Sequence, residues 1–230
     1  EFTVEAGRPD TITREKLEII KSMGAGRISI NPQTMCQRTL ELVGRSHTPK
    51  DIADCLDMAR AVGFNSINMD VIAGLPGEDM ADMEHTLSEI RKLEPDNLTV
   101  HTLAIKRSSR LKQSLGSYEL PDGDTVEGMV QLGMEYARGM GMAPYYMYRQ
   151  KYMSGNLENV GYAKPGKVCM YNIDMMEETT SIMAHGAGAM TKRIFDGECR
   201  VERIPNPKDV STYIAKVGTV AKEKRELYSK

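Results

Sequence analysis

The segment SINMDVIAGLPGEDMADMEHTLSEIRKLEPDNLTVHTLAI, residues 66–105, decides the fold class of this chain. It holds two short apolar runs, 66–72 and 98–105, separated by a stretch over 79–93 that has the spacing of an amphipathic helix. A strand, a covering helix and a second strand form the repeating unit of a parallel sheet, because parallel neighbours need a crossover connection. The segment therefore predicts an α/β fold.

The residues before this segment repeat the same unit. The spacing predicts strands over 2–6 and 27–30 and a short helix over 36–43. Thr13 and Thr48 are expected to cap two further helices, and Pro49 occupies the first helical position, where proline is favoured. Four β/α units are thus predicted before residue 110.

The pattern loosens after residue 107, where the sequence predicts an α+β extension. The predicted elements are a helix over 125–140, a strand over 145–148, a glycine-rich loop over 155–166, strands over 180–184 and 190–195, and a helical end over the last 20 residues. We expect one structural part over 1–115 and a second over 116–230.

Composition excludes several classes of protein. The 30 Lys and Arg residues balance 32 Asp and Glu, so no bulk positive field exists to hold nucleic acid. The apolar runs are much shorter than the roughly 20 residues that span a bilayer, and no signal peptide is recognisable, so we expect a cytoplasmic protein without a membrane span. The cysteines are too far apart for a zinc or ferredoxin-type motif, and no metal site is expected in this chain. They are Cys36, Cys55, Cys169 and Cys199.

Polar residues follow the predicted strands. Glu5 ends the first strand, Gln33 follows the second and Asp70 lies in the third. Because the carboxyl ends of parallel strands converge on one mouth, these side chains could hold an amine and a pair of ribose hydroxyls there. Arg45 could clamp a carboxylate. Such a set suits a nucleotide joined to an amino acid, although each residue could instead be an edge charge, a turn amide, a loop cap or part of a solvated loop.

Seven stretches carry a resemblance to a known family. They are TVEA (3–6), GRISINPQT (26–34), LVGRSHT (42–48), NMDVIAGLPGE (68–78), NLENVGYAKPG (156–166), YNI (171–173) and GAGA (186–189). In order and spacing they resemble the second half of the radical S-adenosylmethionine (SAM) domain, and the region after it, of oxygen-independent coproporphyrinogen III oxidases. The resemblance implies the last four β/α units of a partial (β/α) barrel followed by the extension.

The resemblance also implies a set of contacts to SAM. Glu5 would bind the methionyl amine, Arg45 its carboxylate, Gln33 and Asp70 the ribose, and Ala104 the adenine. Carboxylate, guanidinium and amide groups are chemically suited to these roles.

The implied parent is an oxidoreductase of haem and porphyrin biosynthesis. Its radical abstracts hydrogen from the propionates of coproporphyrinogen III, and loss of CO2 and an electron leaves the vinyl groups of protoporphyrinogen IX. An electron donor protein is an implied partner. The tetracarboxylate substrate calls for cations, for which the candidates are Lys106, Arg107, Arg110, Arg149 and Lys151, with His101 and Tyr148 as weaker candidates.

The chain departs from the family in one large respect. The family holds a [4Fe-4S] cluster on a CxxxCxxC loop, and this sequence has no such loop. We therefore expect a C-terminal fragment whose cluster ligands lie upstream and which is inactive alone, because no cluster means no electron delivery to SAM.

Three other readings of the sequence compete with this one. The chain could be a haem chaperone of the same superfamily, although the HNxxYW signature of those proteins is replaced here by YNIDMM from Tyr171. It could be a SAM-binding module without a cluster. A full-barrel enzyme is disfavoured, because only four β/α units are predicted.

Overall fold

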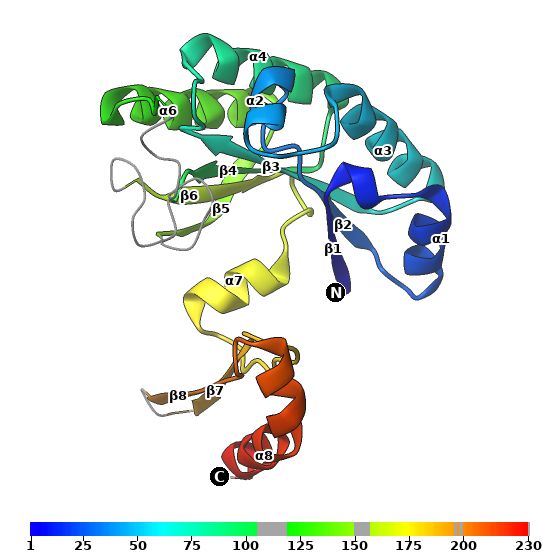
Figure 1. Cartoon of the computed structure of the whole chain (residues 1–230), viewed down its shortest axis with the longest axis vertical. Helices are drawn as coiled ribbons and strands as arrows, with labels where there is room; N and C mark the ends of the chain where they lie inside the picture. The colour runs from blue at the N-terminus through cyan, green and yellow to red at the C-terminus, as the bar shows by residue number, and fades with distance from the viewer. Residues whose placement is uncertain (105–118, 150–156, 196, 198–199, 230) are drawn as a thin grey trace. The chain divides into compact units, whose positions relative to one another are not determined.

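The structure is a computed structural model that describes residues 1–104, 119–149, 157–195, 197 and 200–229 (Figure 1). The chain forms two compact units, Glu1–Cys169 and Met170–Lys230. This division differs from the expected one between 115 and 116. The reason is that two strands beyond residue 140 join the sheet of the first unit.

The first unit is built on a six-stranded sheet with the order β1-β2-β3-β4-β6-β5. The first four strands are parallel, which confirms the predicted α/β fold, and β6 runs antiparallel to both of its neighbours. The strands are β1 (Thr3–Gly7), β2 (Arg27–Ile30), β3 (Ser66–Ala73), β4 (Asn97–Thr102), β5 (Ala143–Tyr148) and β6 (Asn159–Ala163). No closed barrel forms within the described part of the chain.

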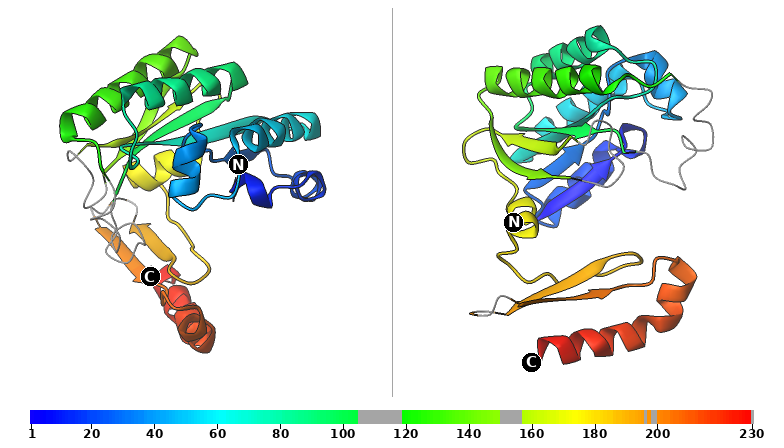
Figure 2. Two further views of the ribbon diagram at one scale, coloured as in Figure 1. Left: turned by 45° about the horizontal axis from the view of Figure 1, so that its top comes forward. Right: turned by 90° about the vertical axis from the view of Figure 1, so that its left-hand side faces the viewer.

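Helices cover one face of this sheet, as both views of Figure 2 show. Ile28, Met69 and Leu98 point to that face and are fully buried. The period of two along each strand then sends the intervening residues to the opposite face. The helical elements are η1 (Pro9–Thr11), α1 (Arg14–Ser22), α2 (Gln37–Leu42), α3 (Pro49–Val62), α4 (Met80–Leu93) and α6 (Gly123–Gly139).

Local sequence signals account for the helix starts. The Thr13 hydroxyl accepts from the amide of Lys16, and Thr48 forms a capping box with Asp51, with Pro49 following the cap as predicted. Helix α4 begins with a second capping box, between Asp79 and Asp82.

The predicted loop over 155–166 is wrong in its centre, because β6 lies there. Gly161 makes this strand possible. A Cβ atom at this position would lie 1.8 Å from an atom of the Tyr146 ring, so the ring of β5 lies against the bare backbone of β6. Glycine thus marks a close approach in a strand rather than a turn.

The second unit contains α7 (Met170–Glu177), β7 (Met190–Phe195), β8 (Arg200–Pro205) and α8 (Val210–Tyr228). Strands β7 and β8 form an antiparallel pair, and α8 packs against both. The strand predicted over 190–195 and the C-terminal helix are confirmed. The strand predicted over 180–184 is wrong, because only Ile182 pairs there, through an isolated bridge to Lys192. No helix in the described ranges has the length and apolar character needed to cross a membrane.

Candidate functional site

A row of polar side chains crosses the sheet face that lies opposite the helices. Ser29 of β2 pairs in register with Glu5 of β1 and Asn68 of β3, and Asp70 pairs with Thr99 of β4. The amide nitrogen of Asn68 donates to Ser29 Oγ and to Asp70 Oδ1, both at 2.8 Å. Thr99 Oγ1 donates to Asn68 Oδ1 at 3.3 Å. These bonds connect Ser29, Asn68, Asp70 and Thr99. Together with Glu5 on β1 and His101 on β4, these four residues are called the polar row here.

The two carboxyl groups in the polar row affect each other electrostatically. Glu5 lies on the edge strand and keeps part of its side chain in solvent, yet the protein atoms around its carboxyl group raise its pKa. The charge of Asp70 raises this pKa further, while hydrogen bonds from Ser29 and Asn31 lower it. A ligand ammonium group would relieve the repulsion between the two carboxylates. The row is therefore suited to an amine.

His101 connects Asp70 on β3 to Tyr148 on the edge strand β5. Its Nε2 lies 3.5 Å from Asp70 Oδ2, and its Nδ1 lies 3.3 Å from the hydroxyl of Tyr148 on β5. A neutral imidazole satisfies both contacts when Nε2 carries the proton and Nδ1 accepts from the phenol. Tyr148 then favours the tautomer that donates to Asp70.

Gln33 and Ala104 line one cavity of about 270 Å³, together with His101 and Tyr148. The backbone of Gln33 is left-handed, with φ of 70°, a conformation that costs free energy for any residue other than glycine. Its amide donates to the carbonyl of Asp70, and its carbonyl accepts from the amide of Ile72. The strained turn thus ties Gln33 to the end of β3 and directs it to the cavity that Ala104 shares.

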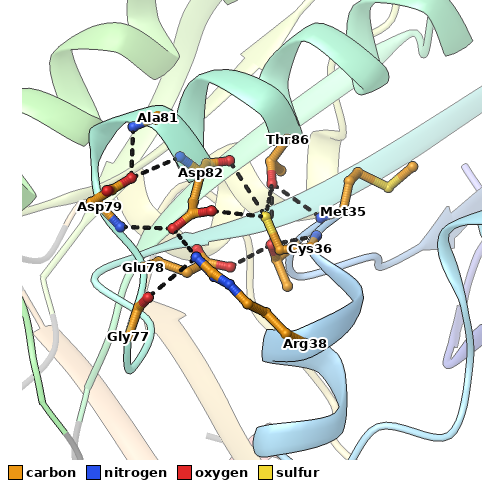
Figure 3. Close-up of polar contacts among 10 residues, drawn as sticks. Met35, Cys36, Arg38, Gly77, Glu78, Asp79, Ala81, Asp82 and Thr86 are labelled. Carbon is orange, nitrogen blue, oxygen red and sulfur yellow. Dashed lines mark hydrogen bonds and ion pairs between the residues drawn. The ribbon is translucent and has the colours of Figure 1, made fainter.

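A buried polar cluster fixes the segment directly after Gln33 (Figure 3). Thr34 Oγ1 donates to Glu78 Oε1 at 2.6 Å, and the amide of Met35 donates to Thr86 Oγ1 at 3.0 Å. Burial raises the pKa of Glu78, while hydrogen bonds from Thr34 and Thr39 lower it. The ion pair of Arg38 with Asp82 closes the exposed side of the cluster (Figure 3). The cluster holds the turn of Gln33 against the start of α4.

The other candidates lie apart from this cavity. Arg45 follows α2 in a second cluster, where burial and the like charge of Arg8 lower its pKa and Asp10 raises it. Arg149 is exposed and pairs with Glu158 at 2.9 Å. The remaining predicted substrate cations, Lys106, Arg107, Arg110 and Lys151, lie outside the described residues.

Part of the network was missed by sequence reasoning. Ser29, Asn68 and Thr99 lie inside short runs that look uniformly buried. Counting strand parity backward from Asp70 and His101 would have placed Asn68 and Thr99 on the same face, whereas Ser29 lies on another strand and needed the strand register. Tyr146, whose side chain is hydrogen-bonded to Thr99, gave no comparable signal, because its position depends on Gly161.

The residues fit SAM and do not fit an iron-sulfur cluster. The paired carboxylates suit an amine, and the cavity between Gln33 and Ala104 adjoins Asp70, a partner for ribose hydroxyls. No group of three potential metal ligands occurs among the residues that the structure describes. Cys36, Cys55 and Cys169 are buried.

Comparison with known proteins shows to which family the chain is related. Residues 1–90 match the radical SAM superfamily. The oxygen-independent coproporphyrinogen-III oxidase-like protein HemZ of Bacillus subtilis is 45% identical over 213 residues, which cover 93% of this chain and 42% of that protein. The chain belongs to the coproporphyrinogen-oxidase-like family of radical SAM proteins. The heme chaperone HemW of B. subtilis is also similar to this chain. The two are 30% identical over 192 residues, which cover 82% of this chain and 47% of HemW.

A solved structure shows the same fold. The structure of coproporphyrinogen III oxidase HemN of Escherichia coli superimposes on this chain with a TM-score of 0.72 and 21% identity. The match covers 95% of this chain and 49% of the HemN chain. The chain thus spans about half or less of the length of the relatives it matches. The predicted radical SAM fold is confirmed.

Proposed function

We propose that residues 1–230 form the SAM-binding sheet and the following region of a radical SAM oxidoreductase that acts on a porphyrinogen. The observation that carries the proposal is the electrostatic coupling of Glu5 with Asp70, which itself contacts Gln33 and His101 in the wall of the cavity that Ala104 also lines. The radical SAM match and the similarity to HemZ support the reaction class.

Each proposed SAM contact follows from the chemistry of a side chain. Glu5 accepts from the amine, Asp70 and Gln33 bind the ribose hydroxyls, and Arg45 binds the carboxylate. Ala104 borders the adenine, where a small side chain leaves room for a ring. When bound beside a reduced [4Fe-4S] cluster, whose ligands we place on residues outside this chain, SAM supplies the hydrogen-abstracting radical.

His101 and Tyr148 are proposed to position Asp70. With the phenol donating to Nδ1 and the opposite nitrogen directed at the carboxylate, Asp70 stays oriented before ligand arrives. Both side chains also border the cavity, from β4 and β5. They therefore lie where bound SAM and a second substrate would meet.

The proposed reaction is the oxidative decarboxylation of coproporphyrinogen III in haem biosynthesis. A hydrogen atom, CO2 and one electron leave each reacting propionate, and a vinyl group remains. An electron donor protein is required for the radical chemistry. The remaining propionates need cationic partners, and we propose Lys106, Arg107, Arg110, Arg149 and Lys151 for this role.

Direct binding of SAM tests the proposal. Equilibrium dialysis of the 230-residue chain against radiolabelled SAM should show saturable binding. Asp70→Ala should weaken it by about 5- to 150-fold, as expected for a lost charge-assisted hydrogen bond of about 1–3 kcal/mol. Asp57→Ala, at an exposed position on α3, is the matched control and should bind as the unmodified chain does. Equal affinity of the two variants would overturn the site assignment.

A haem-carrying role is the second candidate, and the similarity to HemW favours it. Titration of the chain with haem and with coproporphyrinogen, each under anaerobic conditions, separates the two. Preference for haem, together with no effect of Asp70→Ala on turnover in the full-length protein, would replace the oxidase proposal. Saturable SAM binding without either tetrapyrrole would instead favour a SAM-binding module without a cluster.

A further inference from the structure

The second unit contains a cavity of about 500 Å³ beside α8. One helical face supplies most of its wall, with Tyr213, Val217, Val220 and Ala221 at the spacing of successive turns. Met183, which lies outside the helix, also lines the cavity. The remaining lining residues can all carry positive charge. They are His185, Lys224 and Arg225.

Lys224 is unusual because its charge is buried and none of the described residues provides a counter-charge. Only 6% of the residue is exposed, and its ammonium donates to the carbonyl of Ala184. Lys192 in the same unit offers a direct contrast. It is 4% exposed, but its ammonium lies 3.8 Å from the Glu178 carboxylate. Removing a charge from water is costly unless an opposite charge compensates, so the unpaired Lys224 needs an explanation.

The charges around Lys224 increase the imbalance. No acidic side chain lines the cavity, and in the described parts of the chain neither His185 nor Arg225 has a side-chain hydrogen bond or ion pair. The nearest acidic residues in sequence, Glu223 and Glu226, are exposed and do not line the cavity. Glu226 pairs with Lys222 instead. The cavity thus presents a positive end and an apolar body.

We propose that this cavity binds an organic anion that carries a carboxylate on an apolar body. The ammonium of Lys224 and the guanidinium of Arg225 would bind the carboxylate, and the apolar face of α8 would contact the hydrocarbon or ring portion. A volume of about 500 Å³ lies within the usual range of small-molecule sites, roughly 300–1,000 Å³. All of its lining residues belong to the second unit, and the proposal does not depend on the SAM proposal.

Displacement of a fluorescent anion tests the proposal directly. The apolar sulfonate 1-anilinonaphthalene-8-sulfonate should bind the 230-residue chain with increased fluorescence, and Lys224→Met should weaken this binding at least tenfold. Lys216→Met, at an exposed position on the same helix, is the matched control and should leave the affinity unchanged. Equal affinity in both variants would overturn the proposal.

Two competitors identify the source of the carboxylate. Oleate represents aliphatic carboxylates, and coproporphyrin represents carboxylates on a macrocycle. Displacement of the fluorescent probe by oleate or by coproporphyrin, without displacement by the matching methyl ester, supports the proposal. The acid that displaces the probe identifies which class of carboxylate the cavity binds. Displacement by esters as strongly as by acids would refute recognition of charge.

Thermal unfolding provides a readout that needs no ligand. The carbonyl of Ala184 also faces the Thr191 hydroxyl at 3.5 Å, so it keeps a polar neighbour when the lysine is replaced. Without an anion, Lys224→Met should therefore unfold at the same or a higher temperature than the unmodified chain. Oleate or coproporphyrin should stabilise the unmodified chain and not the variant. Arg225→Gln, at an exposed position, provides the binding test if Lys224→Met does not fold; unchanged affinity in Arg225→Gln would then refute the proposal.

Discussion

Substitution of Gly161 by alanine tests the packing that builds the β5–β6 side of the candidate site. The new Cβ would lie 1.8 Å from one Tyr146 ring atom and 2.4 Å from the next, so the ring must leave its place. Overpacking of this kind costs about 1–3 kcal/mol, and the displaced phenol also loses its hydrogen bond with Thr99, worth about 1 kcal/mol. We therefore expect Gly161→Ala to lower the free energy of unfolding by about 2–4 kcal/mol.

A double-mutant cycle separates this clash from the intrinsic effect of replacing glycine by alanine in a strand, which by itself is favourable. Urea unfolding of the 230-residue chain, followed by circular dichroism, gives the free energy of unfolding for each variant. In the background of Tyr146→Ala the clash is absent, so adding Gly161→Ala should no longer destabilise the chain and should stabilise it by up to about 1 kcal/mol. A cost of Gly161→Ala that is the same in both backgrounds, or a negligible cost in the unmodified chain, would refute the packing argument.

Three further predictions concern single side chains. Burial raises the pKa of Glu78, so the native state keeps this proton where the unfolded chain, with the ordinary value of 4.5, has released it. The free energy of unfolding should accordingly fall as pH rises above 4.5, and Glu78→Gln should flatten that fall in urea titrations; an unchanged slope would contradict the burial argument. Burial raises the pKa of the Cys55 thiol to about 11, so little reactive thiolate forms at neutral pH. Mass spectrometry should therefore find Cys55 unmodified after iodoacetamide treatment of the native chain at neutral pH. Rapid alkylation of Cys55 would argue against its burial. His101→Leu should weaken SAM binding by about fivefold, the effect of one hydrogen bond of about 1 kcal/mol, whereas His101→Gln keeps a donor toward Asp70 and should restore most of the affinity in the same dialysis assay.

The β/α units of the first hundred residues could be predicted because each element there has its own local signal. Caps at Thr13 and Thr48 and the change of period mark the boundaries without reference to the rest of the chain. Strand β6 could not be predicted in this way. Its glycine and the proline and glycine that follow it are typical of a loop, and it becomes a strand through pairing with β4 and β5.

The same distinction applies to the candidate site. Glu5, Gln33 and Asp70 could be nominated because they follow from the rule that strand ends converge. The contact of His101 with Tyr148 joins residues from distant parts of the chain and depends on the unpredicted strand order. The unpaired charge of Lys224 could not be predicted at all, because exposure on a helix is decided by the neighbouring strands.

The position of β6 has a consequence for folding during synthesis. Val100 of β4 pairs with Val160 of β6, so about 60 residues must be made after β4 before its outer edge finds a partner. At 5–20 residues per second this takes roughly 3–12 s, far longer than a helix or hairpin needs to form. During that interval the nascent chain presents an unpaired and largely apolar strand edge, the type of surface that aggregates or recruits chaperones. Expression yield should therefore depend on translation speed and chaperone supply between residues 100 and 163 more than on the stability of the finished sheet.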